Sequence, residues 1–155
     1  MKFSTREDVE APIEATFDML CDFENYERQA LRRGAEVRRT DTRTSAGVGM
    51  RWQAQFVMRG RPRDLSLEMI EFQRPDVMGL TFESGGLTGT FQVDCLALSK
   101  TRTRINLAIE LAPQTLSARL LVQSLKLAKT SLNKRFKLRV AEYAKQMEDR
   151  YQAQA

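Results

Sequence analysis

Apolar and polar residues alternate along much of the chain, with the period of two residues that is typical of half-buried β-strands. The alternation is present from Phe3 to Val9 and again from Val37 to Leu111. Turn-forming residues such as Ser84-Gly85-Gly86 divide it into hairpin-length pieces, which implies an antiparallel meander with one apolar and one polar face. We therefore predict a curved sheet of about seven strands, with apolar positions at Phe3–Val9, Val37, Met50–Met58, Leu65–Met69, Met78–Phe82, Phe91–Cys95 and Ile105–Leu111.

Three segments have a helical period instead. After Pro12, apolar residues at helical spacing predict a short helix to about Asp22, and a second helix is predicted from Phe23 to Gly34. Behind the capping residue Thr115, apolar residues recur every three or four positions to Met147, without Gly or Pro. This pattern predicts a single C-terminal helix of about thirty residues, roughly 45 Å long, which would cross the full width of the sheet and cover its apolar face.

This order of elements resembles the START-like or SRPBCC superfamily, whose fold is called helix-grip. The residues that carry the resemblance are Val9–Phe17 with Asp22-Phe23, which are similar to that family's passage from the first strand to the first helix, and Leu111-Ala112-Pro113 before the long helix. The resemblance is to polyketide cyclase/dehydrase-like and coenzyme-Q-binding-like members and covers nearly the whole chain. It implies an α+β fold in one domain over residues 1–155, a length that suits a single domain.

The resemblance also implies a cavity between the concave sheet face and the C-terminal helix, which in this family takes lipids, polyketides, quinones or other bulky apolar molecules. Alternatively, the inward side chains fill one another as an ordinary core. The candidate lining residues are Trp52, Phe56, Met69, Phe82, Phe91 and Leu107 from the strands and Leu121 and Leu125 from the helix.

Two charged residues fall in the inward phase of predicted strands. Glu7 is in phase with Phe3 and Val9, and Arg39 is in phase with Val37. If both face inward, they can pair with each other or hold the polar end of a ligand, and a carboxylate in an apolar cavity can act as a general acid or base. The alternative is that both lie at strand ends, in water.

The 155 residues include two cysteines and no histidine. The missing histidine excludes Ser-His-Asp and Cys-His catalysis and leaves no plausible zinc site, so we expect neither metal nor cofactor. Cys21 and Cys95 form no CxxC pair, and we expect two unpaired thiols. The N-terminus lacks the apolar core of a signal peptide and no apolar run is long enough to span a membrane, so we expect a cytoplasmic protein.

The net charge of +5 is unevenly distributed, because nine basic residues and only three acidic ones lie between Leu116 and Tyr151. Such a segment attracts nucleic acid or anionic membranes, or it is simply a solvated helix face. Aromatic residues do not interleave with its lysines as base stacking requires, so we expect no specific nucleic-acid partner.

These observations favour a non-catalytic binder or carrier of a hydrophobic or amphipathic small molecule, as in lipid transport. One alternative is a metal-free lyase or isomerase of the cyclase/dehydrase type that uses the same cavity, with catalytic residues that no motif identifies. The other is an interaction protein whose basic C-terminal helix contacts a membrane surface or an acidic partner. The sequence leaves the oligomeric state open.

Overall fold

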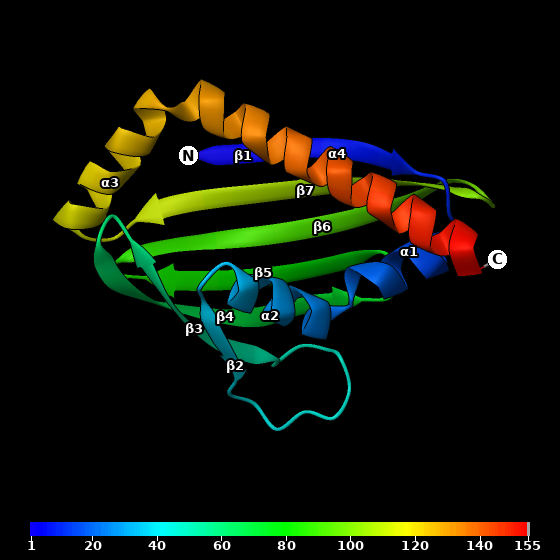
Figure 1. Cartoon of the computed structure of the whole chain (residues 1–155), viewed down its shortest axis with the longest axis horizontal. Coiled ribbons are helices and arrows are strands. Elements are labelled where there is room, and N and C mark those ends of the chain that lie inside the picture. Colours follow the sequence, from blue (N-terminus) through cyan, green and yellow to red (C-terminus); the bar gives the residue numbers. More distant parts are fainter. Residues whose placement is uncertain (155) are drawn as a thin grey trace.

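The computed structural model describes residues 1–154 and contains one antiparallel sheet with helices on one face (Figure 1). The strands lie in the order β1-β7-β6-β5-β4-β3-β2, so the first strand pairs with the last one and β2 forms the opposite edge. The predicted sheet and meander are therefore confirmed. The strands are β1 (Lys2–Val9), β2 (Glu36–Arg39), β3 (Arg51–Met58), β4 (Arg61–Gln73), β5 (Val77–Ser84), β6 (Leu87–Ser99) and β7 (Arg102–Pro113).

Two short helices follow β1, as predicted. Helix α1 (Ile13–Leu20) begins after Pro12, whose extended backbone suits the start of a helix, and α2 (Phe23–Arg32) ends just before Gly34, which has a positive φ of 91°. The two helices pack differently: α1 buries four residues, including Phe17, whereas no residue of α2 is fully buried. Helix α2 therefore lies over the β2 side of the sheet without closing onto it.

The C-terminal segment differs from the prediction, because it forms two helices. Helix α3 (Leu116–Leu127) and helix α4 (Lys129–Gln154) meet at Ala128, whose φ of −100° and ψ of 12° end the first helix. The Ala128 N–H donates to the Leu125 carbonyl at 3.1 Å, and its own carbonyl accepts from Leu132 at 2.9 Å to start the second helix. The bend is physically reasonable because a straight helix cannot follow a curved sheet over this length.

The two C-terminal helices cover different parts of the sheet. Helix α3 packs on the end of β7, while α4 runs along β1 and reaches α1 (Figure 1). The predicted long C-terminal helix packed on the sheet is confirmed as α4, whereas its predicted extent was wrong, because residues Leu116–Leu127 form the separate helix α3. Helix α1 packs against β6 and β7 near one end of the sheet, between α4 on the β1 side and α2 on the β2 side.

The core lies where α1 and α4 meet the inner face of the sheet. Phe17 of α1, Ile105 of β7 and Met147 of α4 are all fully buried there, and each such side chain contributes on the order of 2 kcal/mol of apolar burial. Two polar residues in this region, Thr16 and Thr103, are also fully buried, and the Thr103 hydroxyl donates to the Ala11 carbonyl at 2.8 Å. This bond joins β7 to the segment between β1 and α1.

Across residues 1–154, none of the helices combines the length and the apolar character that a bilayer crossing requires.

Candidate functional site

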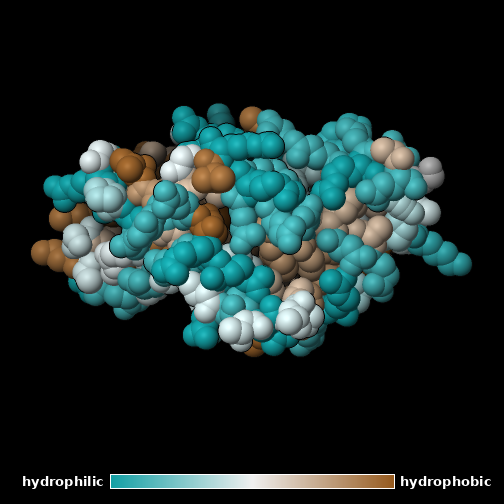
Figure 2. Space-filling model, turned by 60° about the horizontal axis from the view of Figure 1, so that its bottom comes forward, coloured by the Kyte–Doolittle hydropathy of each residue, from teal (hydrophilic) through white to brown (hydrophobic). Residues whose placement is uncertain are grey.

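An apolar cavity of about 550 Å³ lies between the inner face of the sheet, α2 and α4. It exists because α4 packs down onto the β1 side while α2 stands off the other side. In Figure 2, hydrophobic residues are visible between hydrophilic ones near the middle of the molecule. The sheet residues that line the cavity are all apolar or aromatic and come from six strands: Val37, Trp52, Ala54, Phe56, Leu65, Leu67, Met78, Leu80, Phe91, Val93 and Leu107.

The helices supply the opposite wall. Phe23 and Tyr26, which are three residues apart, present one face of α2, and Val140 and Tyr143 present one face of α4. The Phe23 ring lies 5.5 Å from the Trp52 ring, measured between centroids. This contact joins α2 to β3 at the edge of the cavity.

Two tyrosines tie the helices to each other across the cavity wall. The hydroxyl oxygens of Tyr26 and Tyr143 are 2.6 Å apart, and the Tyr26 hydroxyl lies 2.8 Å from the Leu20 carbonyl, to which it donates. The Tyr143 hydroxyl is also within 3.3 Å of the Met19 carbonyl. Burial, reinforced by the Tyr143 hydroxyl, raises the pKa of Tyr26 well above its ordinary value, and burial likewise raises the pKa of Tyr143. Both hydroxyls are therefore protonated at neutral pH.

Other polar groups lie at the rim of the cavity. Glu27 and Gln29 of α2 and Arg139 of α4 line the cavity, and Gln29 and Arg139 are exposed to solvent. This arrangement makes the mouth polar and the sheet side apolar, which suits an amphipathic molecule.

A further cation, Arg63 of β4, is two residues from the lining residue Leu65 but is not itself among the residues that line the cavity. Arg63 is paired in register with Phe56, so both side chains belong to the inner face. The Arg63 Nε is buried and has no hydrogen-bond partner within residues 1–154. A buried N–H without an acceptor is costly, and an acceptor on a bound molecule would remove that cost.

Four of the residues proposed from the sequence line this cavity: Trp52, Phe56, Phe91 and Leu107. Period-two alternation was enough to find them, because the structure keeps the predicted register. Their role in binding stays a prediction, since no ligand is present.

Four other proposed residues lie elsewhere. Met69 is fully buried in the core next to the cavity. Phe82 of β5 is paired in register with Gly89 of β6, and its ring lies over that glycine. A Cβ atom at position 89 would be only 2.6 Å from a ring carbon of Phe82, so the ring occupies the space of the missing side chain. Leu121 and Leu125 are half-buried in α3, which the bend at Ala128 carries to the end of β7.

Glu7 and Arg39 do not pair, so one of the possibilities raised by their phase is excluded. Glu7 is in β1 and Arg39 is in β2, which are the two opposite edges of the sheet. Arg39 instead donates to Asp41 at 2.7 Å and 2.5 Å, and its guanidinium lies 5.4 Å from the centre of the Trp52 ring. Hydrogen bonds from Arg39 and from the Arg51 backbone N–H hold the pKa of Asp41 well below its usual range. Neither Glu7 nor Arg39 is among the residues that line the cavity.

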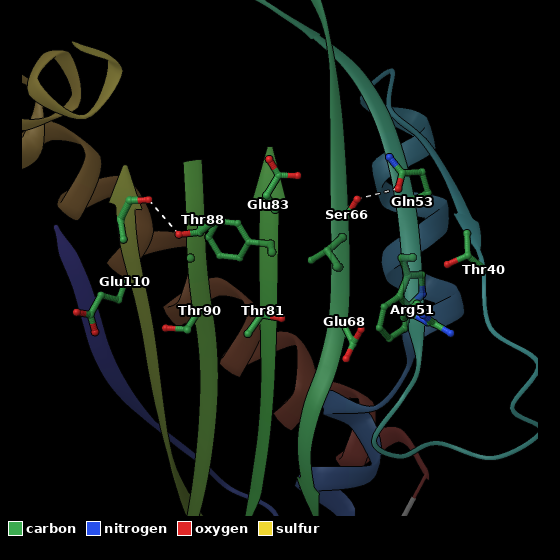
Figure 3. Close-up of a pocket in the computed structure, with 15 residues that line it drawn as sticks. Thr40, Arg51, Gln53, Ser66, Glu68, Thr81, Glu83, Thr88, Thr90 and Glu110 are labelled. Carbon is green, nitrogen blue, oxygen red and sulfur yellow. Dashed lines mark hydrogen bonds between the residues drawn. The ribbon is translucent and has the colours of Figure 1, made fainter. Parts of the chain in front are cut away.

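A second hollow, of about 760 Å³, lies on the outer face of the sheet (Figure 3). Most of its lining side chains are polar and out of phase with those of the cavity. Figure 3 shows three carboxylates among them, Glu68, Glu83 and Glu110, and a hydrogen bond of 2.9 Å from Ser66 to Gln53. Within residues 1–154, no cluster of Cys, Asp and Glu side chains could hold a metal ion.

Sequence reasoning missed the polar groups of the cavity. Tyr26, Glu27 and Arg139 are on helical segments whose orientation depends on packing, and no local motif marks them. Tyr143 was recognised only as part of the apolar face of the C-terminal helix. Its hydroxyl matters because α2 brings Tyr26 opposite to it, a contact between residues 117 positions apart.

Comparisons with known proteins identify the fold. The protein TTHA0849 from Thermus thermophilus matches with a TM-score of 0.65 and 16% identity over 100% of this chain and 99% of its own. The Zhui aromatase/cyclase from Streptomyces sp. R1128 matches with a TM-score of 0.61 and 11% identity over 86% of this chain and 88% of its own. A START superfamily protein from Mycobacterium smegmatis matches with a TM-score of 0.57 and 10% identity over 86% and 95%.

No family model matches the sequence, and no curated protein does. At identities of 10–16%, the structural matches establish the fold. The predicted START-like helix-grip fold is thereby confirmed.

Proposed function

We propose that this protein binds a hydrophobic or amphipathic small molecule, without converting it, in the cavity between the sheet, α2 and α4. The observation that carries the proposal is the cavity of about 550 Å³ with an apolar sheet side and a polar mouth. This volume lies within the range of pockets that hold small ligands. The side chains that face one another across this space leave it open, which favours a binding site over an ordinary core.

The ligand that suits this cavity best is a long or ring-containing molecule with an acidic end. The apolar part would contact Trp52, Phe91 and Leu107. The acidic end would extend past the lining residue Phe56 to accept a hydrogen bond from its register partner Arg63, whose Nε is otherwise unpaired within residues 1–154. Charge-assisted hydrogen bonds of this kind are among the stronger ones in proteins.

The test is a thermal unfolding assay with a panel of fatty acids, quinones and polyphenols, together with native mass spectrometry of the freshly purified protein. A ligand at about one hundred times its Kd stabilises the folded state by about 2.7 kcal/mol, which for a chain of this size raises the Tm by roughly 5–10 °C. If no compound raises the Tm and no molecule is retained on purification, the proposal is wrong.

A cavity-filling variant localises the binding. Ala54 is 4% exposed, faces the cavity and lies between Val37 and Leu65 in register, so Ala54→Phe should abolish the ligand-induced shift. Ala112→Phe, on the exposed outer register of β7, is the matched control and should leave the shift unchanged. An equal response in both variants would place the binding elsewhere.

The acidic end is tested separately by comparing a fatty acid with its methyl ester. The acid should bind more tightly to the unmodified protein, by on the order of tenfold for one charge-assisted hydrogen bond. In Arg63→Met this preference should disappear while the ester binds as before. A preference that survives this substitution assigns the acidic end to another group, such as Arg139 at the mouth.

Catalysis is the competing function, because one protein with a similar fold is an aromatase/cyclase. In this cavity the hydroxyls of Tyr26 and Tyr143 are held protonated and already hydrogen-bonded, which makes them poor proton acceptors at neutral pH. A bound compound recovered unchanged after long incubation supports binding, and a new product supports the enzyme.

A further inference from the structure

Helix α3 has apolar residues on two opposite faces. Ala118 and Val122 are buried on the face toward β7. Leu116, Leu120 and Leu127 are 74%, 60% and 92% exposed, and at 100° per residue they lie within about 40° of one another on the opposite face. A surface helix normally has one apolar stripe, which packs against the core. The second stripe of α3, formed by these three leucines, is exposed and packs against nothing within the described residues.

The hairpin between β3 and β4 extends this apolar area. Its tip presents Met58, 36% exposed and on the inner register of β3, and it is joined to α3 by a hydrogen bond of 3.3 Å from Arg59 to Ser124. Figure 2 shows hydrophobic residues, in brown, on the surface at the left end of the molecule, where Figure 1 places α3 and this hairpin. The exposed residues of both elements therefore form one surface, which we call the α3 surface.

The α3 surface is also strongly basic. Its exposed cations are Arg59, Arg61, Arg119, Lys126 and Lys129. The sequence contains no Asp or Glu from residue 111 to residue 141.

Acidic residues do occur near this end, on another face of the molecule. Asp64, Glu83 and Glu110 are out of phase with the inner residues of their strands and belong to the outer face of the sheet. The cations of the α3 surface are thus not neutralised by carboxylates on the same side.

We propose that the α3 surface docks the protein onto an anionic phospholipid bilayer. Exposed leucines flanked by lysines and arginines match the two parts of such a membrane, since the leucines enter the acyl boundary and the cations contact the phosphates. A second copy of this chain would bring equally basic surfaces together, and RNA would leave the leucines in water. This proposal is independent of the cavity and of its ligand.

The test is sedimentation with vesicles of phosphatidylcholine alone and of phosphatidylcholine mixed with phosphatidylglycerol. We expect binding to the mixed vesicles only, with a decrease as the salt concentration rises from about 50 mM to about 300 mM. Leu116→Ser/Leu120→Ser/Leu127→Ser should lower the partition constant by roughly tenfold or more because the inserting groups are lost. Arg119→Glu/Lys126→Glu should do the same at low salt.

Matched controls lie at the opposite end of the sheet. Leu96→Ser removes an exposed leucine of β6, and Lys100→Glu reverses a charge in the β6–β7 turn. Both should bind vesicles like the unmodified protein. Far-ultraviolet circular dichroism checks that each variant is folded, and because the leucine and charge variants are separate proteins, one of them suffices if the other is unstable.

Several outcomes would overturn the proposal. They are no binding to mixed vesicles, equal binding to both vesicle types, and undiminished binding of the leucine variant. Analytical ultracentrifugation that finds a dimer broken by the leucine substitutions would make this surface a subunit interface instead. RNA binding that the charge variant loses and the leucine variant keeps, without vesicle binding, would assign it to nucleic acid.

Discussion

Removing one hydroxyl from the Tyr26–Tyr143 pair should cost different amounts of stability depending on which tyrosine loses it. Replacement by phenylalanine keeps the ring and its apolar contacts, so the change isolates the hydrogen bonds. The Tyr26 hydroxyl donates to the Leu20 carbonyl in the last turn of α1 and also bonds to Tyr143. Tyr26 is therefore the central member of the pair.

The magnitudes follow from counting which groups lose a partner. In Tyr143→Phe, Tyr26 still donates to Leu20, so the loss is one ordinary hydrogen bond, about 1 kcal/mol. In Tyr26→Phe, the Leu20 carbonyl loses a donor and Tyr143 is left with only the longer contact to Met19, so the loss is about 2 kcal/mol. The double variant should cost about as much as Tyr26→Phe alone, which gives a coupling energy of about 1 kcal/mol.

Urea unfolding followed by far-ultraviolet circular dichroism measures all three variants. The slope of the free energy of unfolding against urea should be the same for each, because the surface exposed on unfolding barely changes. The reasoning would be refuted if Tyr143→Phe cost as much as Tyr26→Phe, or if the two substitutions were additive. Either result would mean that the hydroxyls act separately and do not tie α4 to α1 and α2.

Two further predictions concern the buried polar groups of the core. Burial raises the pKa of Cys95 from about 9 to about 12, so only the unfolded state ionises this thiol between those values, and folding stability should fall as the pH rises above 9. The Cys95→Ala variant has no thiol to ionise, so its free energy of unfolding should lack this dependence on pH. Between pH 7 and pH 10, the free energy of unfolding of the unmodified protein, measured in urea titrations, should fall by about 1.4 kcal/mol more than that of the variant. Parallel pH profiles of the two proteins would contradict the burial of the thiol. Thr103→Val leaves the Ala11 carbonyl without its 2.8 Å donor and should cost about 1–3 kcal/mol, whereas Thr16→Val, whose hydroxyl is 3.5 Å from the same carbonyl, should cost less; the reverse order in thermal unfolding would show that the longer contact is the important one.

The sheet could be predicted from the sequence because its signal is local and repeated. Alternation places Trp52, Ala54 and Phe56 on one face whatever the strand packs against, and the glycines of the β5–β6 turn mark a hairpin. The position of the four proposed residues that line the cavity depends only on this local rule.

The remaining features depend on contacts between distant segments. Neither Gly nor Pro marks the bend at Ala128. The bend depends on how α3 and α4 pack against different parts of the curved sheet, and no local sequence signal reports that packing. Phe82 has the correct phase, yet its ring is displaced to the space above Gly89, an effect of its neighbouring strand. Phase alone allowed Glu7 and Arg39 to pair as one possibility, but phase says nothing about how many strands lie between two residues.

The junction at Ala128 divides the C-terminal segment into two helices that differ in how firmly they are attached to the core. Helix α4 anchors the core through Val140, Ala144 and Met147, whereas α3 is attached by little more than Ala118 and Val122. Backbone amides of α3 should therefore exchange with deuterium through a local opening that leaves α4 protected. One continuous segment would then contain a helix that opens readily and a helix that stays protected, with Ala128 at the boundary between the two.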